Sequence, residues 1–246
     1  MSAFYFKYFS IHQEGVAMRV NTDGVLLGAW VCLPRHTEAP KVLDIGTGSG
    51  VIALMLAQRL SASNQFQNFG IDAVEPHRPS AQTAQKNFDG SPWVSHLRLF
   101  KTTLQEYATT PRTFGYDLIL SNPPYFEDSL RPPEYDRRLV RHTDSLSHTE
   151  LLQDVADLLD FSGCFGVILP TAQQKNFIGM AISVGLHLRR ETMLYTLPKK
   201  SPKRVLMEFI KQEEPTVSDS IVIHEVDDKS YSAAYKELTK DFYLAF

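Results

Sequence analysis

Residues 41–59 read Lys-Val-Leu-Asp-Ile-Gly-Thr-Gly-Ser-Gly-Val-Ile-Ala-Leu-Met-Leu-Ala-Gln-Arg, and this stretch decides the fold of the chain. Its first five residues are an apolar run that predicts a strand, and residues 51–59 predict a helix. The three glycines between them allow φ values that other residues avoid and let the backbone approach a ligand closely. A strand, a glycine loop and a helix in this order open a nucleotide-binding α/β fold.

The spacing of the glycines excludes two common nucleotide sites. In the dinucleotide fingerprint the third glycine would stand where Val51 stands, one place after Gly50. The loop is therefore a poor cradle for the pyrophosphate of NAD or FAD. It is not a Walker loop either, because no Lys followed by Ser or Thr comes after it.

A carboxylate ends the next predicted strand, residues 69–74, at Glu75. At that position it can accept hydrogen bonds from both hydroxyls of a ribose. In the alternative interpretation Glu75 is an acid at a helix start, stabilised by the helix dipole, with Pro76 as the first helical residue. The two interpretations are compatible.

The motif Ser-Asn-Pro-Pro-Tyr, residues 121–125, follows the apolar run 116–120. Each Pro fixes its own φ, lacks an N–H and holds the preceding residue extended, so the loop is stiff and rich in acceptors. The amide oxygen of Asn122, the carbonyl of Pro123 and the ring of Tyr125 suit a planar amine. The motif predicts methylation of an exocyclic or amide nitrogen, if a methyl donor binds nearby. In the plainer interpretation it is a turn after a strand.

Together, residues 44–50, Glu75 and residues 122–125 resemble class I S-adenosylmethionine-dependent methyltransferases of the amino-methylating kind. Residues 9–13, 18–30 and 231–246 are similar to the bacterial tRNA adenine-N6 methyltransferases that act on adenine 37 of a valine tRNA. The resemblance runs over nearly the whole chain. It implies a Rossmann-like, seven-stranded, mostly parallel sheet with an antiparallel edge strand, S-adenosylmethionine as donor, S-adenosylhomocysteine as product, and a tRNA substrate.

On matching positions the resemblance implies two sets of site residues. The catalytic set is Asn122, Pro123, Pro124 and Tyr125. The donor-binding set is Thr22, Asp44, Gly46, Thr47, Gly48, Gly50, Glu75, Thr103, Leu104 and Asn122. Thr103 stands where related enzymes usually carry an Asp that binds the donor's adenine amine. Backbone groups of Thr103 and Leu104, with stacking from Val74, are therefore expected to hold the adenine, and residues 18–21 to cover the methionine end.

The chemistry follows from the acceptor. The lone pair of adenine N6 is delocalised into the ring, so this nitrogen is a poor nucleophile. Hydrogen bonds from the amine to the Asn122 side chain and the Pro123 carbonyl would favour a pyramidal nitrogen and stabilise its developing charge. Tyr125 and Phe126 would stack on the base, which leaves its own stack most easily in a single-stranded loop such as an anticodon loop.

The net charge of −3 and the pI near 6.2 do not by themselves indicate a nucleic-acid-binding protein, so RNA contacts must come from local patches. Two patches qualify, and a solvated loop is the alternative for each. They are Lys199, Lys200, Lys203 and Arg204, and Arg131, Arg137, Arg138 and Arg141. Acidic residues gather elsewhere, at 213–214 and 227–228.

The organisation of the 246 residues indicates one methyltransferase domain, with an N-terminal lid and helix (1–40), a core (41–212) and a C-terminal strand and helix (213–246). A leading helix is expected at 22–31, capped by Asn21 or Thr22. Strands are expected near 41–45, 70–74, 95–100, 117–120, 163–169, 187–196, 204–211 and 221–223. No helix separates the sixth and seventh of these, which predicts an antiparallel pair at the sheet edge.

Apolar content of 43% and charge of 22% are ordinary for a soluble protein. The two cysteines, Cys32 and Cys164, lie in apolar stretches and are expected to be buried thiols. No apolar run approaches the length of a membrane span, the N-terminus lacks the pattern of a signal peptide, and the histidines show no ligand spacing. These features predict a cytoplasmic monomer without a metal.

Other acceptors share this chemistry. The Asn-Pro-Pro-Tyr motif also serves N5-glutamine methylation of proteins and adenine methylation of DNA, and a related motif serves N2-guanine methylation of ribosomal RNA. The segment 18–30 and the absence of a helical N-terminal domain disfavour a protein substrate, and the absence of a second recognition domain disfavours DNA. A catalytically silent RNA-binding protein with the same fold is the alternative from another class, and the intact motif argues against it.

Overall fold

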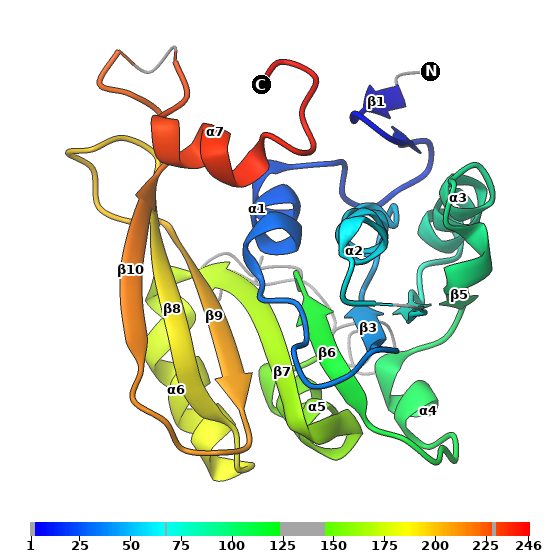
Figure 1. Ribbon diagram of the computed structural model, residues 1–246. Coiled ribbons are helices and arrows are strands. Elements are labelled where there is room, and N and C mark those ends of the chain that lie inside the picture. The colour runs from blue at the N-terminus through cyan, green and yellow to red at the C-terminus, as the bar shows by residue number, and fades with distance from the viewer. Residues whose placement is uncertain (1–2, 67, 124–145, 228–229) are drawn as a thin grey trace, which may run out of the picture.

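A central eight-stranded sheet organises the described part of the chain, which in this computed structural model comprises residues 3–66, 68–123, 146–227 and 230–246 (Figure 1). The strand order is β10-β8-β9-β7-β6-β3-β4-β5. The strands are β3 (Lys41–Ile45), β4 (Gly70–Val74), β5 (Leu97–Phe100), β6 (Tyr116–Ser121), β7 (Leu159–Pro170), β8 (His187–Tyr195), β9 (Arg204–Ile210) and β10 (Val217–Val222). A separate two-stranded hairpin, β1 (Ala3–Tyr5) with β2 (Ser10–His12), was not expected from the sequence.

Helices cover both faces of the sheet. Those on one face are α1 (Thr22–Trp30), α2 (Val51–Ala62), α3 (Arg78–Asp89) and α7 (Ala233–Thr239), and those on the other are α4 (Leu104–Ala108), α5 (His148–Leu158) and α6 (Gln174–Ser183) (Figure 1). Two short 3-10 turns span Val94–His96 and Thr171–Gln173. The predicted α/β class is confirmed, with helices between parallel strands as right-handed crossovers require.

Strand pairing confirms the antiparallel pair and corrects its position. β9 runs antiparallel to β8, as predicted, but it also pairs antiparallel with β7 and so lies inside the sheet. The edge belongs to β10, which runs parallel to β8, and the described sheet has eight strands instead of seven. Residues 217–220 are exposed, so the sequence of β10 lacks the apolar residues that mark a buried strand, and only 221–223 stood out.

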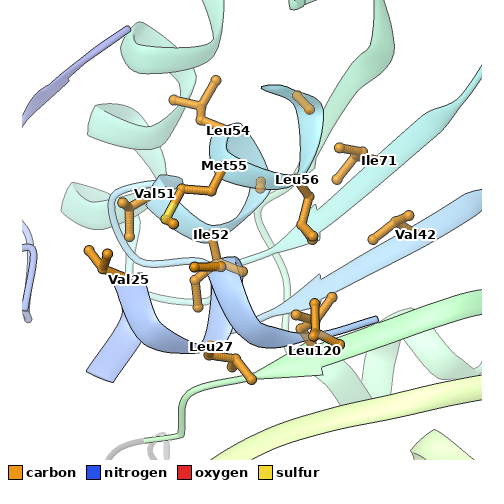
Figure 2. Close-up of a cluster of buried hydrophobic side chains, with 14 of the residues drawn as sticks. Val25, Leu27, Val42, Val51, Ile52, Leu54, Met55, Leu56, Ile71 and Leu120 are labelled. Carbon is orange, nitrogen blue, oxygen red and sulfur yellow. The ribbon is translucent and has the colours of Figure 1, made fainter. Parts of the chain in front are cut away.

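The core on the α1 side is an apolar cluster in which α1 and α2 gather over Val42, Ile71 and Leu120 of the sheet (Figure 2). The two helices approach closely at Gly28, because a Cβ there would lie 3.0 Å from the sulfur of Met55. All residues of α1 from Gly24 onward are buried, since sheet, α2 and α7 surround it. The start of α1 is therefore held firmly in place.

Capping and one ion pair place the start of α1. The side chain of Asn21 accepts a hydrogen bond of 2.9 Å from the Gly24 N–H, so Asn21 is the N-cap, as expected. Asp23 accepts from the guanidinium of Arg204, the first residue of β9, at 2.9 Å. Because β9 is antiparallel to β7, its first residue lies at the edge where the parallel strands end.

No helix in the described ranges is both long and apolar enough to cross a membrane. The same residues contain no group of three or more His, Cys, Asp or Glu side chains arranged to hold a metal ion.

Candidate active site

Four parallel strands end in register at one edge of the sheet. Ile45 of β3 pairs with Val74 of β4 on one side and with Ser121 of β6 on the other, and Val74 pairs with Phe100 of β5. The segments that follow these strands, with the glycine loop, Glu75 and Asn122, therefore begin side by side. This edge is where ligands bind in open α/β sheets.

The three glycines of the loop have positive φ angles, +68° at Gly46, +59° at Gly48 and +85° at Gly50. A Cβ on Gly46 would have nothing within 4 Å, and one on Gly48 would meet only a backbone oxygen at 4.0 Å. A Cβ on Gly50 would lie 2.5 Å from the ring of Phe88. The first two glycines therefore border open space that a ligand can enter, whereas the third is needed for packing on α3.

Hydrogen bonds to β4 hold the glycine loop. The N–H groups of Gly46 and Thr47 donate to the Val74 carbonyl at 2.9 and 3.1 Å. The Gly48 N–H donates to Oε2 of Glu75 at 2.8 Å, and the N–H of His77 donates to its Oε1 at 2.8 Å. Each carboxylate oxygen keeps a lone pair for a further donor, so Glu75 is oriented to accept from a pair of hydroxyls.

Glu75 lies before the helix and not in it. The helix α3 begins at Arg78, with His77 as its N-cap, so the interpretation of Pro76 as the first helical residue is wrong. Glu75 is 7% exposed and contacts the loop, which leaves its role toward a ligand as the more economical explanation of its position.

Asp44, the acid at the end of β3, is fully buried and joins the loop to α2. Its Oδ2 accepts from the hydroxyl of Thr47 at 2.5 Å and from the N–H of Ala53 at 3.2 Å. Burial raises the pKa of Asp44 to about 7, although these two hydrogen bonds lower it, and the nearby charge of Glu75 adds to the rise. Its Oδ1 has no partner within the described residues and is free to accept from a cationic ligand group.

Asn122 and Pro123 follow β6 directly, and Asn122 is half-buried and Pro123 buried. The Ser121 hydroxyl donates to the Ile45 carbonyl at 3.2 Å, which ties the end of β6 to the start of the glycine loop. A Cβ on Gly24 would lie 3.7 Å from Nδ2 of Asn122, so the first turn of α1 borders Asn122. Seven predicted residues lie outside the described ranges: Pro124, Tyr125, Phe126, Arg131, Arg137, Arg138 and Arg141.

Thr103 has a structural role that was missed. It is the N-cap of α4, and its hydroxyl accepts from the Glu106 N–H at 3.2 Å while its own N–H donates to the Glu106 carboxylate at 3.4 Å. This capping box was visible in the sequence as Thr-x-x-Glu. Leu104 is buried in the first turn of α4, and Thr22 is the first residue of α1.

The first basic patch divides into two kinds of residue. Lys199, Lys200 and Lys203 are exposed on the hairpin between β8 and β9, and no described residue pairs with their side chains. Arg204 is half-buried and pairs with Asp23. Because β8 runs parallel to β7, this lysine hairpin (residues 196–203) lies at the same edge of the sheet as Asn122.

Two cavities lie elsewhere in the described part of the molecule. One of about 530 Å³ lies where α4 and α5 end and β6 and β7 begin, at the opposite edge of the sheet. The other, of about 310 Å³, lies between β1 and the C-terminal residues. Neither is lined by a predicted site residue, so strand register and hydrogen bonding define this site, and cavity size does not.

Comparison with known proteins gives consistent results. Residues 26–165 match the model of the family described as "Methyltransferase small domain". Proteins named tRNA1(Val) (adenine(37)-N6)-methyltransferase are 42% identical in Bacteroides fragilis (98% of this chain, 97% of that protein) and 39% identical in Haemophilus influenzae (100% of both). A solved structure from Agrobacterium tumefaciens, titled a predicted O-methyltransferase, has a TM-score of 0.64 at 15% identity over 89% of this chain and 96% of that one, which shows the fold alone.

Proposed function

Since this chain belongs to the tRNA1(Val) (adenine(37)-N6)-methyltransferases, we propose that it transfers a methyl group to N6 of adenine 37 in a valine tRNA. The methyl donor is S-adenosylmethionine, and S-adenosylhomocysteine is the product. The proposal includes a single methyltransferase domain over residues 1–246, acting as a monomer in the cytoplasm.

The observation that carries this proposal is the register of β3, β4 and β6, which starts the glycine loop, Glu75 and Asn122 at one edge. The residues present fit the donor. Gly46 and Gly48 border open space, Glu75 has lone pairs for the ribose hydroxyls, and the buried Oδ1 of Asp44 can accept from an ammonium group. When bound, the donor supplies a methyl group made electrophilic by a positive sulfonium. Thr22, Thr47, Gly50, Thr103, Leu104 and Asn122 complete the proposed donor set.

The acceptor half of the reaction falls to Asn122 and Pro123. Their oxygens can take the two hydrogens of the adenine amine, which draws the N6 lone pair out of the ring and stabilises positive charge on nitrogen. The methylated nitrogen is positively charged and acidic, so it releases one of its two protons to water without a dedicated base. On sequence grounds, Pro124 is proposed to restrict the backbone of the motif, and Tyr125 and Phe126 to stack on the base, a contact worth about 1–3 kcal/mol.

The lysine hairpin supplies phosphate contacts at the same edge of the sheet as Asn122. Lys199, Lys200 and Lys203 are exposed at that edge, whereas Arg204 serves to hold the hairpin to α1 through Asp23. Arg131, Arg137, Arg138 and Arg141 are proposed as further RNA contacts on sequence grounds.

The test is methyl transfer from labelled S-adenosylmethionine to total RNA from a strain that lacks the gene, followed by nucleoside analysis. Label in N6-methyladenosine of tRNA is expected, and the purified Asn122→Ala variant serves as the inactive control. Label in N2-methylguanosine or in protein would replace the proposed acceptor, and no label with any substrate would favour a silent RNA-binding protein.

A further inference from the structure

Asn87 on α3 has a buried side-chain amide, and both of its N–H groups donate hydrogen bonds to segments that are distant in the sequence. Its Oδ1 accepts from the His12 N–H at 2.9 Å, and its Nδ2 donates to the His12 carbonyl at 3.0 Å and to the Ser49 carbonyl at 2.8 Å. Ser49 lies between Gly48 and Gly50, inside the glycine loop, and Asn87 is 3% exposed. One side chain thus joins the end of β2 to the glycine loop.

The contact with His12 belongs to a longer row along α3. Thr83 donates through its hydroxyl to the Glu14 carbonyl at 2.5 Å, and the Ser80 hydroxyl accepts from the Ala17 N–H at 3.1 Å. Positions 80, 83 and 87 lie on one face of a helix. This polar face of α3 therefore holds the N-terminal segment, residues 12–20, by its backbone.

The N-terminal segment leads directly to the start of α1. The Val20 N–H donates to Oε1 of Gln13 at 2.8 Å, which closes the segment on itself, and Asn21 then caps α1. Because Gly24 in the first turn of α1 borders Asn122, the segment connects the glycine loop on one side with the acceptor motif on the other.

Two consecutive residues of α3 contact the glycine loop. Asn87 holds the Ser49 carbonyl, and the ring of the next residue, Phe88, fills the space where Gly50 would carry a Cβ. The hydrogen bond from Asn87 directs the Ser49 carbonyl toward α3.

We infer that Asn87 is a positioning residue of the donor site, which sets the glycine loop and the N-terminal segment in one geometry for binding the donor. The inference rests on the proposed function, because it takes the loop to be the donor cradle. Asn is the residue type that this position requires: Asp has the same shape but no N–H, and would place a carboxylate against the carbonyls of His12 and Ser49.

The experiment compares S-adenosylhomocysteine binding by calorimetry in the wild type, Asn87→Ala, Asn87→Asp and Thr83→Val. The Thr83 variant is the matched control, since it loses one bond to the same N-terminal segment and none to the glycine loop. Asn87→Ala is expected to raise the Kd about tenfold and Asn87→Asp more, because buried groups lose their partners. Thr83→Val should change the Kd less than about twofold, which corresponds to the smallest net contribution of a single hydrogen bond.

Two further measurements separate positioning from general damage. Denaturant titrations give the folded fraction of each variant, and steady-state kinetics should show a higher KM for the donor with an unchanged KM for tRNA. Equal Kd values in the wild type and both Asn87 variants would overturn the inference, as would losses that match the folded fraction or appear equally in Thr83→Val. A wild type that binds no S-adenosylhomocysteine would instead overturn the proposed function.

Discussion

The donor half and the acceptor half of this site are built on different physical terms. In the donor half, backbone N–H groups of Gly46, Thr47 and Gly48 are already bonded to Val74 and Glu75. In the acceptor half, one polar side chain, Asn122, follows β6, and the positive charges at this edge of the sheet belong to the exposed lysines of the hairpin. The donor half is thus held by hydrogen bonds within the protein, whereas the lysines of the hairpin have no partner among the described residues and are proposed to take theirs from the RNA.

The difference explains what each half can discriminate. A preorganised cradle recognises a small ligand through fixed hydrogen bonds, and these lose little freedom on binding. Exposed lysines attract phosphate without reading sequence, so they add affinity and salt dependence. Each of the following variants should therefore disturb one half and spare the other.

The largest expected effect is that of Asn122→Ala on methyl transfer. Loss of one group that stabilises charge in a transition state lowers the rate by about 100- to 1000-fold. Binding of S-adenosylhomocysteine should weaken far less than the rate falls, because Asn122 is one of many proposed donor contacts and the loop and Glu75 are untouched. Single-turnover transfer and calorimetry measure the two quantities. A parallel loss of donor binding would show that the two halves are not separable at this residue.

Glu75→Gln should have the opposite effect, because it should weaken donor binding and leave tRNA binding unchanged. Each carboxylate oxygen of Glu75 accepts a hydrogen bond from one backbone N–H. In the Gln variant the side-chain NH2 group would face one of these N–H groups, and that hydrogen bond would be lost. A hydrogen bond to a charged group contributes about 1.5–3 kcal/mol. We expect donor affinity to fall about 10- to 100-fold with tRNA affinity unchanged. Glu150→Gln is the control, a carboxylate that also accepts from backbone but caps α5. Similar losses in both variants would point to general destabilisation.

The role of the lysine hairpin can be tested with two double variants of equal net charge. One double variant carries Lys199→Ala and Lys200→Ala in the hairpin. The other carries Lys41→Ala and Lys211→Ala at the opposite edge of the sheet, where β3 begins and β9 ends. The first pair should weaken tRNA binding roughly tenfold and lower the slope of log K against log salt by about 1.4–1.8, and the second should do neither. Filter binding from low to high salt measures both, and equal slopes for the two pairs would exclude the hairpin as an RNA contact.

Sequence alone predicted the strand, the glycine loop and the helix of residues 41–59 because backbone demands are local. Three glycines with positive φ leave few alternatives for residues 46–50, and Glu75 ends a strand in an apolar pattern. The edge strand β10 escaped because its residues are exposed, and the role of Asn87 escaped because its partner His12 is 75 positions away. Pairings at that separation leave no periodic trace in a single chain.

The smallest expected effect is on folding stability, which the buried Asp44 of the donor half lowers as the pH rises. Asp44 is buried with its pKa raised to about 7, while in the unfolded chain it titrates near 3.8. Between these values the folded protein keeps a proton that the unfolded chain has released, so this group makes stability fall as the pH rises, by at most about 1.4 kcal/mol per pH unit.

Asp44→Asn, which cannot ionise, should lack this slope. The unfolding free energy of the variant relative to the wild type should therefore rise from pH 5 to about 7 and level off above it, as denaturant titrations at pH 5, 6, 7 and 8 can measure. Parallel curves across this range would mean that Asp44 is not the carboxylate that titrates there. A rise would show that the donor half keeps a buried acid at a cost in stability, which a cationic ligand beside Oδ1 would offset.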